Sequence, residues 1–285
     1  MARSLPDVAP SPAFDVTRLL DTGVVSVRDV HCRGECRHRS AEECIAATHL
    51  VFPYRGTYLR HVGSTQAVAD ANHVLLFNAG EGYQVSHPVE GGDSSVSLNL
   101  AEPVLRELAP NGALRAGDGA GFRHQALRVD ARAQALVALL RHALHHRRIE
   151  ALEAEGLALT LASRSLGPRT TRAAGATHAR QRLVDRAKLL LASDLGRRWT
   201  LAEIAAEVGG SPVYLTQAFK QVEGMPLYRY QLQLRLARAL DLLEGDTDLS
   251  TLAQELGFSS HSHFAAAFRQ AYGRSPSAFR DSTAA

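Results

Sequence analysis

SPVYLTQAFKQVEG, residues 211–224, is the stretch from which the organisation of the chain can be worked out. Ser211 followed by Pro212 predicts a helix start, because the serine hydroxyl caps free backbone N–H groups and proline at the first helical position has no N–H to leave unsatisfied. Apolar residues then recur at helical spacing. They are Leu215, Ala218, Phe219 and Val222. The stretch therefore predicts a helix with one buried stripe and an exposed opposite face.

A second short helix is predicted immediately before this stretch. Thr200 and Glu203 have capping-box spacing, and Gly209-Gly210 ends the predicted helix. Its apolar stripe consists of Leu201, Ile204, Ala205 and Val208. Two short helices joined by a Gly-containing turn are typical of the helix-turn-helix motif, whose second helix enters the major groove of DNA.

The motif is repeated about fifty residues further along the chain. The repeated positions are Leu249, Leu252, Ala253, Leu256, Gly257, Phe264, Phe268, Arg269 and Gly273. Between the copies, residues 226–243 have the pattern of a long amphipathic helix, with Leu232, Leu236, Ala239, Leu240 and Leu243 on one face. Such a spacer would hold two reading helices in successive major-groove faces, about 34 Å apart.

The run from Arg198 to Arg280 carries an ordered series of motif residues, including Ser211-Pro212, Tyr214-Leu215, Phe219-Lys220, Gly224, Tyr230, Arg235-Leu236, Gly257-Phe258-Ser259, Phe268-Arg269, Gly273 and Ser275-Pro276. In this order they resemble the DNA-binding domain of AraC-type transcription regulators. The resemblance implies binding to double-stranded DNA and no enzymatic activity, hence no catalytic residues. The DNA-binding residues that it implies are Val213, Tyr214, Thr216, Gln217, Lys220, Ser260, His261, Ser262, His263 and Arg269.

The residue types in the two reading helices predict unequal roles. Gln217 can pair bidentately with adenine, and Val213 can touch a thymine methyl group. Lys220 is expected to contact phosphate. The second helix has Ala266 where many relatives place an arginine. We therefore expect the first helix to carry most of the sequence specificity, and the second to dock by shape and phosphate contact.

The N-terminal half has a different pattern. The 285 residues are enough for two cores, and a hydrophobic content of 45% with 21% charged residues is that of a globular protein. Short apolar or alternating runs, separated by turn formers, predict a β-barrel or jelly roll. They start at Val24, Ala46, Thr57, Gln66, His73, Gln84 and Ser95. AraC-type regulators often carry a cupin-like jelly roll here, and residues 78–81, 87–88 and 91–93 are similar to what such domains show.

The predicted fold class is thus α+β, with an N-terminal cupin-like β jelly roll followed by helices and a C-terminal all-α domain with two helix-turn-helix motifs. We expect an effector-sensing and dimerisation domain at residues 1–162, a basic flexible linker at 163–178 and the DNA-binding domain at 179–285. The Ala/Leu-rich helical region 130–161 is the candidate for homodimer contacts, with packing on the barrel as the alternative. Its apolar stripe consists of Leu136, Leu139, Leu140, Ala143 and Leu144.

Three cysteines, Cys32, Cys36 and Cys44, lie close together in the sequence beside His31 and His38. They argue against a disulfide framework and are interpreted as ordinary reduced cysteines. A cysteine-based sensor of metal, oxidant or alkylation is the alternative, since Cys32-x-x-x-Cys36 has the spacing of one half of the zinc site in alkylation-repair regulators with this DNA-binding domain.

Four histidines of the predicted barrel, His49, His61, His73 and His87, are spaced singly, without the His-x-His pair of catalytic cupins. We therefore predict neither a metal site nor a cofactor, and interpret residues 91–93 as a simple turn. A cupin oxygenase fused to a DNA reader is the less favoured alternative.

The resulting interpretation is a sequence-specific transcription regulator, an activator, that responds to an unidentified small-molecule effector. Its expected partners are promoter DNA, RNA polymerase and a second copy of the chain. The sequence shows no signal peptide and no apolar run of membrane-spanning length, so a cytoplasmic location without membrane association is expected.

Overall fold

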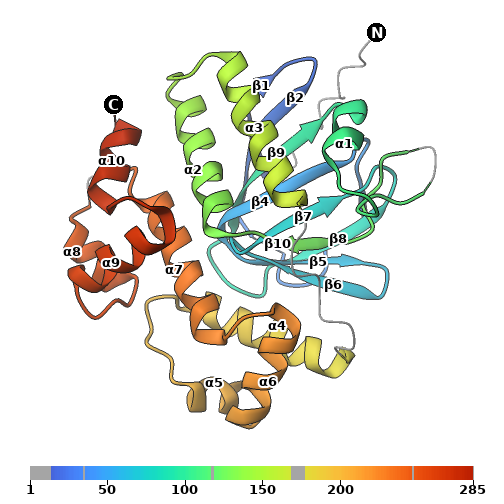
Figure 1. Ribbon diagram of the computed structural model, residues 1–285. Coiled ribbons are helices and arrows are strands. Elements are labelled where there is room, and N and C mark those ends of the chain that lie inside the picture. The colour runs from blue at the N-terminus through green and yellow to red at the C-terminus, as the bar shows by residue number, and fades with distance from the viewer. Residues whose placement is uncertain (1–13, 35, 117–118, 168–176, 246, 285) are drawn as a thin grey trace. The chain divides into compact units, whose positions relative to one another are not determined.

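The computed structural model describes residues 14–34, 36–116, 119–167, 177–245 and 247–284 (Figure 1). The chain divides into two compact units, Met1–Pro168 and Arg169–Ala285. Each unit has its own hydrophobic core.

The first unit is built on two antiparallel sheets. The six-stranded sheet has the order β1 (Phe14–Asp21), β2 (Val25–Cys32), β9 (Asp93–Leu100), β4 (His49–Gly56), β7 (His73–Phe77), β10 (Ala126–Arg128). The four-stranded sheet has the order β3 (Glu43–Cys44), β8 (Gly82–Ser86), β5 (Tyr58–Val62), β6 (Thr65–Ala69). Three helices complete the unit: α1 (Glu102–Leu108), α2 (Ala131–His145) and α3 (Ala151–Leu166).

Strands β4 and β7 of the large sheet are buried on both faces, which explains their continuous apolar runs. On β4, Leu50 and Phe52 belong to the core beneath α2 and α3, whereas Val51 between them belongs to the core that β4 and β7 share with the small sheet. Successive side chains of a strand point to opposite faces, so a strand covered on both sides needs apolar residues throughout. The helices cover one face of the large sheet in Figure 1.

The predicted β-rich N-terminal region with following helices is confirmed, as is the helical C-terminal domain. Each of the seven runs overlaps a strand, but β1, β3 and β10 were missed. β1 is largely exposed, and β3 and β10 have two and three residues. None of them shows a run of alternation long enough to recognise. The cupin-like assignment stays a prediction.

The helices after the sheets pack on them. Ala133, Val137 and Leu140 of α2 and Leu161 of α3 are buried in the sheet core, whereas Leu152 is 81% exposed. The buried face of α2 therefore includes only part of the predicted stripe. These side chains pack on the sheet, which was the alternative to homodimer contacts. Homodimer contacts stay a proposal.

The predicted linker began too early. Residues 163–166 belong to α3, where Ser165 and Leu166 are buried, because the apolar spacing of that helix continues to its last turn. Residues 168–176 lie outside the described residues.

The second unit contains seven helices within its described residues: α4 (His178–Ser193), α5 (Leu201–Val208), α6 (Pro212–Glu223), α7 (Leu227–Leu242), α8 (Leu249–Glu255), α9 (His261–Tyr272) and α10 (Pro276–Ala284). The 16 residues of α7 correspond to a length of about 24 Å. Four of its predicted apolar positions are buried and Leu232 is half-buried. In the described part of the chain, no helix has the length and hydrophobicity that crossing a membrane requires.

Candidate DNA interface and effector cavity

The first helix-turn-helix consists of α5, a two-glycine turn and α6. Thr200 and Glu203 form the complete predicted capping box, and Gly209 ends α5 in the left-handed conformation with φ 72°. The side chain of Ser211 accepts a hydrogen bond from the Tyr214 backbone N–H at 3.2 Å, as an N-cap does. These local contacts fix where both helices begin and end.

The capping box also perturbs Glu203. Its carboxylate accepts hydrogen bonds from the Thr200 hydroxyl at 2.7 Å and the Thr200 backbone N–H at 2.8 Å. These bonds, with a further one from Arg197, lower the pKa of Glu203 to about 2. The carboxylate is therefore ionised throughout the physiological pH range.

All five residues assigned to the first reading helix are exposed on α6: Val213, Tyr214, Thr216, Gln217 and Lys220. Val213 is 68% exposed and Tyr214 beside it is 40% exposed, so both side chains are accessible to a partner. The Thr216 hydroxyl donates to the Pro212 carbonyl at 2.9 Å, so its proton is used within the helix and only its methyl group and lone pairs remain for a partner.

The flank of this helix includes a residue that sequence reasoning did not assign to the site. Arg180, near the start of α4, donates to Gln221 Oε1 at 2.8 Å, and its guanidinium carbon lies 6.0 Å from the centre of the Tyr214 ring. The signal for its position was Thr177, which caps α4 by accepting from the Arg180 N–H.

The second helix-turn-helix repeats the arrangement with α8 and α9. Asp248 caps α8, and Ser260 caps α9 by accepting from the His263 N–H at 3.1 Å. All five residues assigned to the second reader are exposed: Ser260, His261, Ser262, His263 and Arg269. In the alanine run, Ala266 is exposed and Ala267 is buried. Between His263 and Arg269, α9 therefore has no side chain that can form a hydrogen bond.

His263 is held in place by its neighbours. Its Nδ1 atom lies 3.0 Å from the Ser259 hydroxyl oxygen, and its ring packs edge-on against Phe258 at 5.5 Å between centroids. This leaves Nε2 as the ring atom available to a partner. These two contacts restrict the orientation of the His263 ring.

A pair of arginines connects the two motifs. Arg235 of α7 donates to the carbonyl oxygens of Leu195 and Arg197, before α5, and of Gly257, after α8. Arg198 donates to the carbonyl oxygens of Gly257 at 3.3 Å and Phe258 at 2.7 Å. These two arginine side chains therefore link the segment before α5, where the first motif begins, to the turn between α8 and α9 in the second motif.

A family model described as a helix-turn-helix domain matches residues 204–282. The "HTH-type transcriptional activator RhaR" of Klebsiella pneumoniae is 33% identical over 102 residues, which are 35% of this chain and 36% of that protein. The chain carries an AraC-type helix-turn-helix domain. The matched residues include α6 to α9 with Arg235, whereas the capping box of α5 and Arg198 lie just before residue 204.

Two further comparisons cover different shares of the chain. The "Probable transcriptional regulator LumQ" of Photobacterium leiognathi is 27% identical over 77% of this chain and 86% of its own length. A solved AraC-type regulator from Chromobacterium violaceum is 29% identical, covers 38% of this chain and 97% of its own, and gives a TM-score of 0.36. The chain spans 36% and 27% of the first two curated relatives it matches, RhaR and a PocR protein of Salmonella typhimurium.

The first unit contains a cavity of about 630 Å³ between β2, the segment before β4 and α1. Its lining includes Arg18, Arg28, Thr48, Asn99, Glu102 and Arg115. Arg18 pairs with Asp21 at 3.0 Å, and Arg115 pairs with Glu81 at 2.8 Å. Among the described residues, the half-buried Arg28 has no carboxylate partner. The cavity therefore has room for a small molecule and one uncompensated positive charge.

The four barrel histidines have separate surroundings. His49 is half-buried and stacks on Phe77, and desolvation of its ring lowers its pKa to about 4. His61 lies 2.9 Å from the Ser86 hydroxyl, and His73 lies 2.8 Å from Asp70. His49, His61 and His73 thus each lie beside a different group, and Nδ1 of His61 has no hydrogen-bond partner within the described residues. His87 differs, because it lies beside cysteines.

The cysteine cluster of the sequence is divided in the fold. Cys32 is buried at the end of β2, Cys36 is half-buried, and Cys44 is exposed on β3. The Cys36 sulfur lies 3.3 Å from Nδ1 of His87, whose Nε2 donates to Asp93 at 2.7 Å. Burial by itself would lower the pKa of His87, but hydrogen bonds with Asp93, Cys32 and Cys36 outweigh it and raise the pKa to about 10. Sequence reasoning missed His87 and Asp93 as neighbours of the thiols.

Proposed function

We propose that this chain is a sequence-specific transcription regulator that binds duplex DNA through α6 and α9. The observation that carries the proposal is the pair of capped helix-turn-helix motifs in an AraC-type domain, each with its second helix presenting exposed side chains suited to base edges and phosphates. The N-terminal α+β arrangement and the LumQ comparison support a regulator with a separate sensing unit.

The test is DNA binding by the full chain. Genomic fragments bound by the protein would be mapped, and affinities for the mapped site and for scrambled duplexes measured by fluorescence anisotropy over a range of salt concentrations. We expect tighter binding to the mapped site by a factor on the order of 10³ or more. Equal affinity for both duplexes at every salt concentration would contradict the proposal.

We further propose that the effector is a small anion that binds in the cavity of the first unit. Arg28 supports this assignment, because its half-buried guanidinium has no carboxylate partner within the described residues and therefore favours an anionic ligand. Bidentate pairing with carboxylate or phosphate suits its geometry. Arg28→Gln should retain specific DNA binding and lose the response to the effector. Arg18→Gln is the matched control, because Arg18 lines the same cavity but is paired with Asp21.

Activation and self-association are also proposed. The name of the RhaR relative supports an activator, which implies contact with RNA polymerase, and α2 with α3 remains the proposed dimer surface. Expression of the genes that flank the mapped sites should fall when the gene for this chain is deleted. Sedimentation at micromolar concentration should give a dimer mass.

A further inference from the structure

A group of side chains of metal-binding types lies where strands of both sheets of the first unit meet. Cys32 is the last residue of β2 and Asp93 is the first residue of β9, and the two are cross-strand partners in the antiparallel register. Gly56, at the end of β4, is the partner of Asp93 on its other side. His87 directly follows β8. The site is therefore assembled from both sheets.

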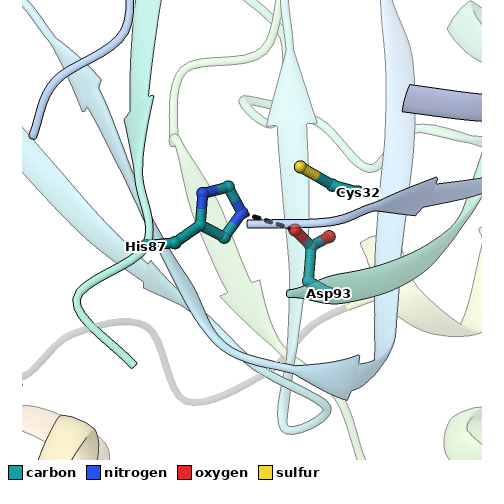
Figure 2. A group of neighbouring side chains, drawn as sticks. All are labelled: Cys32, His87 and Asp93. Carbon is teal, nitrogen blue, oxygen red and sulfur yellow. Dashed lines mark hydrogen bonds and ion pairs between the residues drawn. The ribbon is translucent and has the colours of Figure 1, made fainter. Parts of the chain in front are cut away.

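The donor atoms converge in a buried position. One ligand atom each of Cys32, His87 and Asp93 lies within 4.8 Å of the other two, and all three residues are buried. Figure 2 shows the imidazole of His87 turned toward the carboxylate of Asp93, with the Cys32 sulfur beside them. A thiol, an imidazole and a carboxylate sharing one buried point are unusual unless they are paired or coordinate a metal.

The backbone around this group is closely packed. Gly34, Gly56 and Gly92 have φ values between 66° and 72°. A Cβ atom on Gly92 would lie 2.1 Å from the Cys32 carbonyl oxygen, and one on Gly56 would lie 2.0 Å from the Gly92 carbonyl oxygen. The turn before Asp93 thus packs backbone to backbone against the ends of β2 and β4. This close approach holds the three ligands together before any ion binds.

Cys36 completes the surroundings of the imidazole. Its carbonyl oxygen accepts a hydrogen bond from the His87 backbone N–H at 2.7 Å, and its sulfur lies 3.3 Å from Nδ1. A histidine that binds metal through Nε2 commonly donates its other N–H to a neighbouring acceptor, which fixes the orientation of the ring. Cys36 is in the position of that acceptor.

We propose that Cys32, His87 and Asp93 bind one zinc ion, with Cys36 as a positioning residue for His87. Thiolate, imidazole and carboxylate are all zinc ligands, and three protein ligands leave a fourth tetrahedral position for water or another donor. The mixed set argues against Mg²⁺ or Ca²⁺, which prefer oxygen ligands, and the carboxylate argues against Cu(I).

Binding requires only small movements and a defined release of protons. Donor atoms around a tetrahedral zinc ion are about 3.5 Å apart, so His87 Nε2 and Asp93 Oδ1 would separate from 2.7 Å by roughly 1 Å. The ion takes the place of the proton between these two atoms and of the Cys32 thiol proton. Both protons pass to solvent, so zinc affinity should rise with pH.

The experiment uses the reduced full chain stripped of metal with a chelator. Zinc would be titrated in competition with a chromophoric zinc indicator, and cobalt(II) would be added separately as a spectroscopic probe. We expect one zinc ion per chain. The cobalt form should show the intense near-ultraviolet band of a thiolate ligand and the visible bands of a tetrahedral ion.

Variants assign the ligands. Cys32→Ser, His87→Gln and Asp93→Asn should each lower zinc affinity on the order of 100-fold or more, and Cys36→Ser by about 10–100-fold, the range for a group that orients a ligand. Cys44→Ser and His38→Gln are the matched controls, since both residues are exposed, and they should leave the affinity unchanged. Circular dichroism of each variant establishes that it is folded.

Two results would overturn the proposal. One is a cobalt(II) spectrum of the unmodified chain without a thiolate band, which requires no variant and therefore stands even if a ligand variant fails to fold. The other is a loss of affinity in Cys44→Ser equal to that in Cys32→Ser, which would place the ion elsewhere.

Discussion

Gln217 on α6 and Arg269 on α9 are both exposed, and they test the division between base recognition and phosphate binding. Gln217→Ala should lower affinity for the mapped site by about 1–3 kcal/mol, because a bidentate base contact is lost, and should leave binding to scrambled DNA almost unchanged. Arg269→Ala should weaken both complexes by a similar factor. It should also reduce the slope of log affinity against log salt concentration by about one unit. Anisotropy titrations with single-base variants of the site measure both effects.

The control for this comparison is Gln254→Ala, because Gln254 is an exposed glutamine on α8, the first helix of its motif. It should change neither discrimination nor the salt slope. If His261→Ala degrades discrimination more than Gln217→Ala does, the assignment of α6 as the main reading helix is wrong.

The low pKa of Glu203 predicts that the free energy of unfolding depends on pH. Its pKa is about 2 in the folded chain and ordinarily 4.5, so its carboxylate stabilises the fold above pH 4.5, and this contribution is lost as the pH falls from 4.5 toward 2. Glu203→Gln should therefore flatten the decline of urea-unfolding free energy in this window. Glu207→Gln, at an exposed position on α5, is the control. If the free energy of unfolding declines equally in Glu203→Gln and in the unmodified chain, the stabilising role of the Glu203 carboxylate is wrong.

Among the connections between elements, the contact between the two motifs depends on Gly257. A Cβ atom there would lie 2.2 Å from the Gly196 carbonyl oxygen and 2.7 Å from an Arg235 nitrogen, whereas a Cβ atom on Gly273 meets nothing within 4 Å. Both glycines have φ near 76°, so alanine costs about 1–2 kcal/mol of conformational strain at either position. Gly257→Ala should cost clearly more, because the Arg235 hydrogen bonds must also shift. Urea unfolding of the two variants measures the difference, and equal losses would contradict the role of the contact.

For the whole molecule, the division into two units predicts that DNA binding survives removal of the first. A fragment of residues 177–285 keeps the Thr177 cap of α4 and the complete second core. It should prefer the mapped site over scrambled DNA without responding to effector. It should bind more weakly than the full chain if unit 1 makes the proposed dimer, because a linked pair of domains gains effective concentration. Folded fragment with no sequence preference would show that the first unit contributes to recognition.

What the sequence determined by itself is the local structure and the reading faces that follow from it. The capping box at Thr200 and Glu203, the caps at Ser211 and Ser260, and the glycine helix ends involve residues three or four positions apart, so their physics is complete within a short segment. Helical periodicity then decides which side chains are exposed, and all ten assigned positions lie on the surface. The short apolar or alternating runs likewise overlap seven of the strands, because strand periodicity is also a local property of the sequence.

Only the tertiary structure decided which distant residues meet. Arg180 reaches Gln221 across 41 positions, and Cys36 meets His87 across 51, because strand register and helix packing bring them together and no periodicity records such pairs. Cys32 and Asp93 face each other through the pairing of β2 with β9, which the three glycine turns make possible by admitting backbone where a side chain would clash. The cavity beside Arg28 likewise exists only where β2 and α1 converge with the loop before β4. Adjacency in sequence grouped Cys44 with Cys32, whereas the fold placed His87 and Asp93 there instead.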